Sequence, residues 1–283
     1  KIYFNYNIGK HTWFRTGGNA KIFAIIENNI ELEIILNEIN NENFYILGSG
    51  SNLLIRDCGF DGIIIKLGKE FNTINIFENK LEVGTGVLDI NLSKFALKHG
   101  IKGFEFFSGI PGSIGGAVKM NAGCYGSETN EIIDSIELYN KKFQKENINK
   151  DNLNLTYRSS NIKDDEIISK VIFNLQYGDS NIIQQKMIDI KEKRLLSQPI
   201  KNKTSGSTFK NPKSMYAARL IDQAGCKGME YGDAIVSNQH ANFLINKGRA
   251  SATDIETLGK RVIDKVYKKF NIILDWEIKI IGD

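Results

Sequence analysis

Two short segments rich in glycine and serine could bind a phosphate group. The first, GSGSNLL, spans residues 48–54 and directly follows an apolar stretch typical of a strand, and the second, SGIPGSIGGAVKMNAG, spans residues 108–123. Consecutive backbone N–H groups in tight turns can surround an anion, and serine hydroxyls add further donors. Neither segment has the pattern of a P-loop or of a Gly-rich turn that opens the first helix of a dinucleotide fold.

The two segments differ in how strongly they indicate a ligand. A tight turn at the end of a strand explains GSGSN as well as a ligand does. The longer segment and its continuation favour ligand contact, because a purely structural loop rarely needs so many glycines: Gly109, Gly112, Gly115, Gly116, Gly123 and Gly126. Two such loops suggest a long ligand with a diphosphate, such as a dinucleotide.

Three polar residues are candidates for catalysis: Arg158 in LTYRSS, Ser207 in SGSTFKNP and Glu277 in DWEIKIIG. Taken singly, each has a structural alternative: Arg158 could form a surface ion pair, Ser207 could be a turn residue, and Glu277 could face solvent from a strand. The three histidines at positions 11, 99 and 240 lack metal-ligand spacing, so no metal site is expected.

The elements that must position these residues follow from apolar periodicity. We expect strands at 21–26, 44–47, 62–67, 73–77, 80–86, 131–140, 166–177, 234–237, 242–246 and 277–281, and helices at 32–39, 88–99, 182–196, 217–224 and 253–270. The hydrophilic piece 141–152 is expected to form a surface hairpin. The last helix is expected to begin with a Thr253-x-x-Glu256 capping box and to bury a stripe of Ile255, Leu258, Val262, Val266 and Phe270. This order predicts an α+β protein with a domain boundary within 178–200.

The composition indicates a globular protein that needs neither a metal nor a disulfide framework. Its 283 residues are 41% hydrophobic and 25% charged, with a net charge of +4 and no continuous basic stripe, so no nucleic-acid partner is expected. The cysteines at 58, 124 and 226 are odd in number and form no CxxC pair, which favours a reducing cytoplasm. No apolar run approaches the ~20 residues of a spanning helix, so no membrane insertion is expected.

The sequence as a whole resembles the UDP-N-acetylenolpyruvoylglucosamine reductase (MurB) family. The resemblance rests on eight ordered motifs: HTWFRTGGNA (11–20), LGSGSNLLI (47–55), GIPGSIGGAVKMNAGCYG (109–126), YRSS (157–160), SQP (197–199), GSTFKNP (206–212), SNQHANFLIN (237–246) and the terminal WEIKIIG. Only the short stretch 159–181 separates Arg158 from the helix expected at 182, so the chain resembles the shorter, type II form of the family.

The resemblance implies noncovalently bound FAD in a two-part unit of the vanillyl-alcohol-oxidase/PCMH type, followed by an α/β substrate domain. The implied division is 1–66 and 67–180 for the two FAD-binding subdomains and 181–283 for the C-terminal domain. It further implies that NADPH and UDP-N-acetylglucosamine enolpyruvate are the substrates, in cell-wall peptidoglycan synthesis, with a cytoplasmic monomer or weak homo-oligomer.

The resemblance also implies roles for individual residues. Ser207 matches the proton donor, and Arg158 and Glu277 match the pair that stabilises the enol intermediate. The implied substrate-binding residues are Lys210, Asn211, Arg194 and Gln198. The implied cofactor-binding residues are Gly48, Ser49, Gly50, Ser51, Asn52, Gly109, Pro111, Gly112, Ser113, Gly115, Gly116, Ala117, Asn121, Ala122 and Gly123. Cys124 stands where the family usually has alanine, and Trp13 and Trp276 stand at variable positions; none of these departures touches an implied catalytic group.

Two other functions remain open at this point. A flavin oxidase of the same fold that acts on a small alcohol or sugar predicts fast reaction of reduced flavin with O₂. A nucleotide- or sugar-binding module without turnover predicts that SGSTFKNP and WEIKIIG are incidental, and their occurrence together in the order of the family counts against it.

Overall fold

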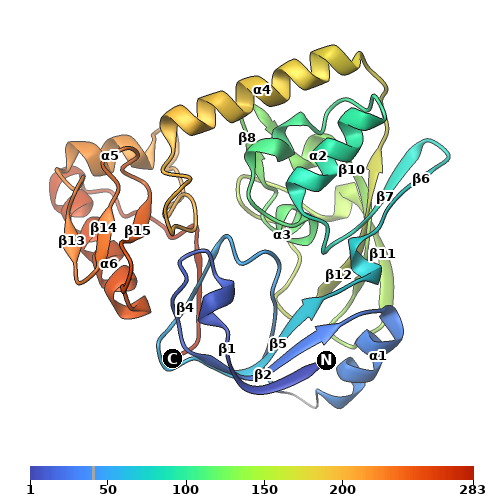
Figure 1. Cartoon of the computed structure of the whole chain (residues 1–283), viewed down its shortest axis with the longest axis horizontal. Helices are drawn as coiled ribbons and strands as arrows, with labels where there is room; N and C mark the ends of the chain where they lie inside the picture. The colour runs from blue at the N-terminus through green and yellow to red at the C-terminus, as the bar shows by residue number, and fades with distance from the viewer. Residues whose placement is uncertain (40–41) are drawn as a thin grey trace. The chain divides into compact units, whose positions relative to one another are not determined.

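A computed structural model describes residues 1–39 and 42–283 of the chain (Figure 1). Contacts between residues divide the chain into two compact units, each formed by segments that are distant in sequence. Unit 1 consists of residues 1–3, 23–49 and 62–193, and unit 2 consists of residues 4–22, 50–61 and 194–283. Helices and sheets are mixed in the chain, so the α+β class predicted from the order of elements is confirmed.

Three of the points at which the chain passes from one unit to the other lie within strands, namely β1 (Ile2–Asn7), β2 (Asn19–Ile26) and β5 (Phe60–Leu67). These strands and β3 (Phe44–Ile46) form a sheet in the order β1-β2-β5-β3. β3 runs parallel to β5, with Tyr45 opposite Ile64. The apolar runs predicted as strands at 21–26, 44–47 and 62–67 are therefore strands.

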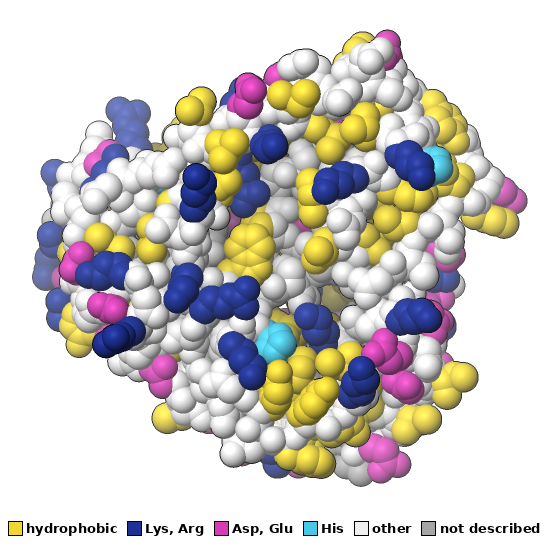
Figure 2. Space-filling model, viewed as in Figure 1, with side chains coloured by type: hydrophobic (Ala, Val, Ile, Leu, Met, Phe, Trp, Pro, Cys, Tyr) yellow, Lys and Arg dark blue, Asp and Glu magenta, His cyan; other side chains and the backbone are white. Residues whose placement is uncertain are grey.

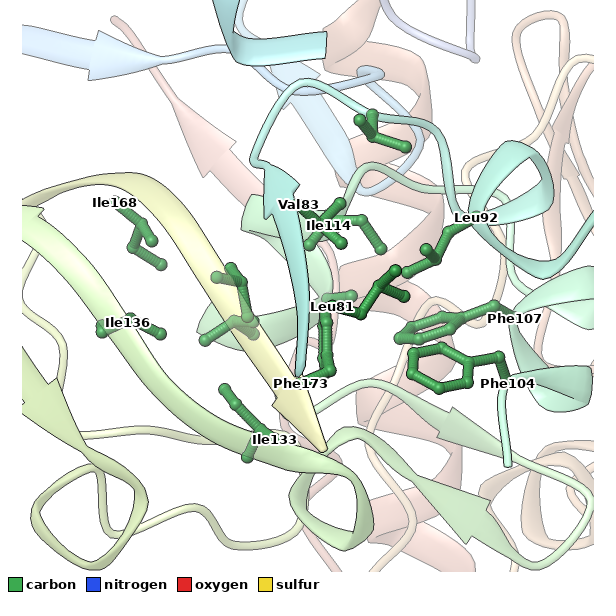
Figure 3. Packing of buried hydrophobic residues seen from close by; sticks show 14 of the residues in the cluster. Leu81, Val83, Leu92, Phe104, Phe107, Ile114, Ile133, Ile136, Ile168 and Phe173 are labelled. Carbon is green, nitrogen blue, oxygen red and sulfur yellow. The ribbon is translucent and has the colours of Figure 1, made fainter. Parts of the chain in front are cut away.

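The larger sheet of unit 1 is antiparallel throughout, in the order β11-β10-β12-β7-β6. Its strands are β6 (Ile74–Phe77), β7 (Lys80–Gly84), β10 (Ile133–Tyr139), β11 (Lys145–Asn149) and β12 (Ile167–Asn174). β10 and β11 form a hairpin, and the hydrophilic piece 141–152 contains both its turn and strand β11, as predicted. Phe104, Phe107 and Phe173 pack with Leu81 and Leu92 in the core beside this sheet (Figure 3).

Helices and short strands complete unit 1. The helices are α1 (Asn29–Glu38), α2 (Asp89–Lys98), α3 (Ile114–Lys119) and α4 (Ser180–Ser197), whose last residues belong to unit 2. A small ladder joins β8 (Gly123–Cys124) to β9 (Ser127–Glu128). The 3₁₀ helices of the chain are η1 (Gly9–His11), η2 (Glu70–Asn72), η3 (Glu105–Gly109), η4 (Thr129–Glu131) and η5 (Lys150–Asn152).

Unit 2 has a three-stranded antiparallel sheet of β13 (Glu230–Tyr231), β14 (Ala234–Val236) and β15 (Leu244–Asn246). Helix α6 (Ala252–Phe270) packs on this sheet, and α5 (Ala217–Gln223) packs on α6. The terminal strand β16 (Lys279–Ile281) runs parallel to β4 (Leu53–Ile55). Phe14 and Leu54, from the early segments of the chain, are fully buried in the core of this unit.

The start of α6 corrects the predicted capping box. Ser251 is the N-cap and Asp254 is its partner: the Ser251 side chain accepts from the Asp254 N–H, and the Asp254 side chain accepts from the Ser251 N–H. Thr253 lies inside the first turn, where its N–H and hydroxyl both donate to Asp57. The predicted Thr253–Glu256 box is therefore wrong, because the carboxylate of Asp57 takes the N–H groups at the start of the helix.

Glu256 instead forms an ion pair within unit 2. Arg56 donates two hydrogen bonds to its carboxylate, over 2.9 and 3.2 Å, and the Lys260 ammonium lies 2.7 Å from it. The bonds from Arg56 are the main cause that lowers the pKa of Glu256 to about 2. Four residues of the predicted apolar stripe, Ile255, Leu258, Val262 and Val266, are buried as expected, while Phe270 is half-buried.

The surface and the helices add two observations. Lys and Arg side chains are dispersed over the visible face of Figure 2 among apolar and uncharged ones. Within residues 1–39 and 42–283, no helix has both the length and the apolar character needed to cross a bilayer.

Candidate functional site

The start of the first Gly-Ser segment lies against the second segment in unit 1. An added Cβ at Gly48, in the turn after β3, would come 2.4 Å from the Ser113 hydroxyl oxygen. Ser113 precedes α3, and a bridge between Ser113 and Leu88 fixes it to the residue before α2. Two segments more than sixty positions apart in the sequence therefore contribute to one loop cluster.

Backbone N–H groups in this cluster are available to a ligand. Among the residues of the two segments that belong to unit 1 and that the structure describes, four have an N–H group that donates to no acceptor: Gly48, Gly112, Ser113 and Gly116. The two N–H groups between them, of Ile114 and Gly115, donate to the Val87 and Thr85 carbonyls. Unbonded N–H groups on adjacent turns favour an anion, which supports the predicted phosphate contact.

The glycines of the second segment have different reasons to be glycine. A Cβ at Gly112 would lie 2.3 Å from a carboxylate oxygen of Asp89, and a Cβ at Gly115 would lie 3.0 Å from Cβ of Thr85. At Gly116, which is exposed, the nearest atom would be the Ser113 hydroxyl oxygen at 3.8 Å. Protein packing therefore explains Gly112 and Gly115, and of these three glycines only Gly116 leaves space beside it for a ligand.

Asp89 is a buried acid at this cluster that sequence reasoning missed. It is the first residue of α2 and has no exposed surface, and neither carboxylate oxygen has a hydrogen-bond partner in the described residues. Burial raises its pKa well above the ordinary value. The sequence signal that could have found it is an acid within the apolar run GVLDINL, next to a helix start.

Other predicted cofactor contacts take part in packing as well. Ala117 and Asn121 are buried, and Ala117 belongs to the core of unit 1. Gly109 packs on α4, where a Cβ would meet the Ile190 side chain at 2.7 Å. Gly50, in unit 2, has a φ of +70°, and a Cβ on it would meet the His11 carbonyl oxygen.

Arg158 lies at the tip of a tight turn that is attached to the Gly-rich segment of unit 1. Thr156 and Ser159 exchange two backbone hydrogen bonds of 3.1 Å, which places Arg158 at a φ of +52°. The side-chain amide of Asn121 donates to the Thr156 carbonyl over 3.1 Å, and the Arg158 guanidinium donates to the Gly123 carbonyl over 3.0 Å. The structure therefore fixes this arginine to the second Gly-Ser segment.

Ser207 and Glu277 lie on neighbouring segments of unit 2. The Glu277 N–H donates to the carbonyl of Thr208, the residue after Ser207, over 2.8 Å. The Asn52 side chain, from the first Gly-Ser segment, donates to the Glu277 carbonyl over 3.0 Å. Both Ser207 and Glu277 are half-buried, so their side chains remain partly accessible.

The predicted substrate-binding residues also belong to unit 2. The Lys210 N–H donates to the Asp275 carbonyl over 2.8 Å, beside the strand-like bridge between Phe209 and Trp276. Asn211 accepts from the Ala217 N–H at the start of α5, and the Arg194 guanidinium donates to the Gln198 side chain over 3.2 Å.

A basic hollow of about 190 Å³ in unit 2 was not predicted. Trp13, Arg15, Lys201, Asn202 and Lys203 line it. Its three cations form no ion pair within the described residues, and no acid lines the hollow. Arg15 has a φ of +57°, and its guanidinium donates to the Lys10 carbonyl over 2.5 Å. Trp13 and Arg15 lie in the motif HTWFRTGGNA, but the hollow could not be predicted from it because Lys201, Asn202 and Lys203 come from a distant segment that meets this motif only in the fold.

The described residues contain no group of three or more His, Cys, Asp or Glu side chains that could hold a metal ion.

Comparisons with known proteins cover almost the whole chain. Residues 20–142 match the family model of a FAD binding domain, and residues 198–281 match that of the C-terminal domain of UDP-N-acetylenolpyruvoylglucosamine reductase. The UDP-N-acetylenolpyruvoylglucosamine reductase of Rickettsia typhi (strain ATCC VR-144 / Wilmington) is 45% identical over 280 residues, which cover 98% of this chain and 95% of the relative. The enzyme of the same name from Rickettsia rickettsii (strain Sheila Smith) is 44% identical over the same coverage.

A solved structure agrees with these relatives. The crystal structure of UDP-N-acetylenolpyruvylglucosamine reductase (MurB) from Thermus caldophilus superposes with a TM-score of 0.86 at 32% identity, covering 100% of this chain and 98% of that chain.

Proposed function

The chain belongs to the UDP-N-acetylenolpyruvoylglucosamine reductase family, and on that premise we propose that it uses NADPH to reduce UDP-N-acetylglucosamine enolpyruvate to UDP-N-acetylmuramate in peptidoglycan synthesis. The family resemblance inferred from eight motifs is confirmed by the 45% identity over 98% of the chain. The enzyme is thus a FAD-dependent oxidoreductase, a UDP-N-acetylmuramate dehydrogenase by its reaction.

One observation carries the assignment of FAD to unit 1: the unbonded N–H groups of Gly48, Gly112, Ser113 and Gly116 on two touching loops. A diphosphate matches them because it presents several acceptor oxygens and negative charge to N–H donors. We propose that these two loops hold FAD noncovalently. Bound FAD would supply a ring that accepts hydride from one substrate and passes it to the other.

Arg158 is proposed to stabilise the charge that develops on the substrate. Addition of hydride to the methylene carbon of the enolpyruvyl group leaves negative charge delocalised into the neighbouring carboxylate, and a fixed cation lowers the energy of that state. The guanidinium is suited to this role because Gly123 accepts a hydrogen bond from it and its carbon lies 5.0 Å from the ring centre of Tyr157.

Ser207 is proposed to give a proton to the carbanionic carbon, and Glu277 to act on the same enol intermediate. The serine hydroxyl is a weak acid, but the carbanion is a much stronger base than the alkoxide that serine would become. The position of the Ser207 hydroxyl therefore matters more than its acidity. The bond from the Glu277 N–H to the Thr208 carbonyl supports the pairing, since it keeps the two backbones adjacent. A protonated Glu277 carboxyl would donate a hydrogen bond to the enol intermediate, and an ionised carboxylate would instead orient a neighbouring side chain.

Unit 2 is proposed to bind the nucleotide substrates. Lys210, Asn211, Arg194 and Gln198 are the proposed contacts of the UDP-sugar, and the basic hollow is proposed to attract the phosphates of incoming nucleotides. Positive charge that no acid balances raises the local concentration of anions, so this hollow is consistent with NADPH and a UDP-sugar as substrates.

Several finer assignments remain proposals. We propose the division 1–66, 67–180 and 181–283, the type II form, a monomer or weak homo-oligomer, and a cytoplasmic location. The separate matches at 20–142 and 198–281 support a FAD-binding part followed by a C-terminal part.

Anaerobic spectroscopy tests the proposed function. The purified protein should show the yellow spectrum of oxidised flavin, lose it on addition of NADPH, and regain it only when UDP-N-acetylglucosamine enolpyruvate is added. A folded protein without flavin would contradict the FAD assignment. Recovery of colour with O₂ but not with the enolpyruvyl substrate would instead support an oxidase.

A further inference from the structure

Asp89 contacts the second Gly-Ser segment at Gly112. Its carboxylate oxygen Oδ2 is so close to Gly112 that an added Cβ there would lie 2.3 Å away, and its own N–H donates to the Gly112 carbonyl over 3.2 Å. Gly112 and its neighbour Ser113 carry two of the unbonded N–H groups proposed to face the FAD diphosphate. A buried acid therefore contacts the loop that carries these N–H groups.

The carboxyl has no compensating partner. It has no exposed surface, both oxygens are buried without a hydrogen bond in the described residues, and desolvation is the single cause that raises its pKa. The adjoining stretches 84–88 and 110–116 contain no ionisable side chain. On η3, which packs against α2, Glu105 accepts from the Gly103 N–H and lies 3.6 Å from the Lys186 ammonium. The other ionisable residues of α2 itself are Lys94 and Lys98.

The charge state of this carboxyl therefore affects the loop. A buried carboxylate without a counter-charge is strongly disfavoured, and it would attract water into a packed site. It would also repel an anion held by the nearby N–H groups of Gly112 and Ser113, since both charges are negative, and the low dielectric of a buried site strengthens that repulsion. A neutral carboxyl has neither effect.

We propose that Asp89 is a positioning residue for the cofactor: as a neutral acid it supports Gly112 and Ser113 in the geometry that binds FAD, and its ionisation releases FAD. The proposal rests on the assignment of FAD to the two Gly-Ser segments. It gives the enzyme a cofactor affinity that decreases as pH rises. The direction follows because a carboxyl with a raised pKa is neutral at low pH and becomes ionised as the pH rises through that pKa.

The test is the FAD dissociation constant of the holoenzyme as a function of pH. Flavin fluorescence during serial dilution measures release, and far-UV circular dichroism at each pH confirms that the protein stays folded. We expect the dissociation constant of the unaltered enzyme to rise about tenfold or more between pH 6 and pH 10. Asp89→Asn should retain the tight binding seen at low pH across the whole range, because its amide has a similar shape and cannot ionise.

Two further variants make the result decisive. Asp165→Asn removes an exposed acid of the same unit and should keep the pH profile of the unaltered enzyme. If Asp89→Asn does not fold, Asp89→Ser serves as the second uncharged variant and should also bind FAD without pH dependence. A flat profile in the unaltered, flavin-bearing enzyme would overturn the proposal, as would a profile in Asp89→Asn with the same slope. Absence of flavin at every pH would instead contradict the FAD site itself.

Discussion

Gly116→Ala separates a glycine required by a ligand from one required by the protein. Gly116 is exposed, lies in α3, and would place a Cβ no closer than 3.8 Å to any other side chain. Alanine forms helices better than glycine by about 0.5–1 kcal/mol per residue, so the variant without FAD should be as stable as the unaltered protein or more stable by up to this amount.

The same substitution should weaken FAD binding. The Gly116 N–H has no acceptor within the described residues, and a Cβ beside it would hinder an anion from approaching that donor. The loss of one hydrogen bond to a charged group costs about 1.5–3 kcal/mol, which corresponds to an increase in the FAD dissociation constant of about tenfold to a hundredfold.

Gly115→Ala is the matched control, one residue earlier in the same helix. Its Cβ would lie 3.0 Å from Cβ and 3.3 Å from the carbonyl oxygen of Thr85, so overpacking of about 1–3 kcal/mol should outweigh the helix gain. Thermal unfolding at graded FAD concentrations and flavin fluorescence on dilution measure stability and affinity separately. The reasoning fails if Gly116→Ala binds FAD as tightly as the unaltered enzyme, or if it destabilises the protein as much as Gly115→Ala does.

Three further predictions concern unit 2. Ser207→Ala should leave the reduction of flavin by NADPH intact and slow the reoxidation of flavin by the enolpyruvyl substrate by about 10²-fold or more. Stopped-flow absorbance measures both steps, and loss of flavin reduction by NADPH would exclude the proposed role of Ser207. Glu256→Gln should lower the free energy of unfolding by about 1–2 kcal/mol at pH 7, because it weakens the bonds from Arg56. Since the pKa of Glu256 is about 2, this contribution is complete above the ordinary value of 4.5 and is lost as the pH falls towards 2, so urea titrations of the two proteins should converge in acid; a constant difference would contradict this. Replacing Lys201 and Lys203 by glutamine should raise the KM for NADPH a few-fold at low salt and much less at about 1 M salt, and a change independent of salt would exclude an electrostatic cause.

Local pattern predicted most of the regular structure. Runs such as GIIIKL and KLEVG combine β-branched residues with nearby turn residues, and both are strands. The stripe on α6 was equally clear, because apolar residues spaced three and four apart can be buried together only on a helix.

Contacts between residues distant in sequence determine the start of α6 and the need for glycine at 112 and 115, which local sequence pattern could not predict. Two capping-box patterns overlap at the start of α6, one that begins at Ser251 and one that begins at Thr253. Asp57, which lies 195 positions before Ala252, accepts a hydrogen bond from the Ala252 N–H and so favours the helix start at Ser251. In the same way, the side chains that require glycine at 112 and 115 belong to Asp89 and Thr85. The glycine density was therefore a correct sign of close approach, but the sequence could not separate approach by protein from approach by a ligand.

The composition of unit 2 has a consequence for how this protein can be divided. The C-terminal family match covers one continuous segment, 198–281, yet Phe14 and Leu54 belong to the core of unit 2, and Asp57 accepts hydrogen bonds from the first turn of its longest helix. The family match therefore marks a segment whose core and helix start depend on residues outside it. We expect that a fragment cut at residue 198 would expose apolar core surface, and that grafting it onto another protein would also require the strand and turn residues from the beginning of the chain.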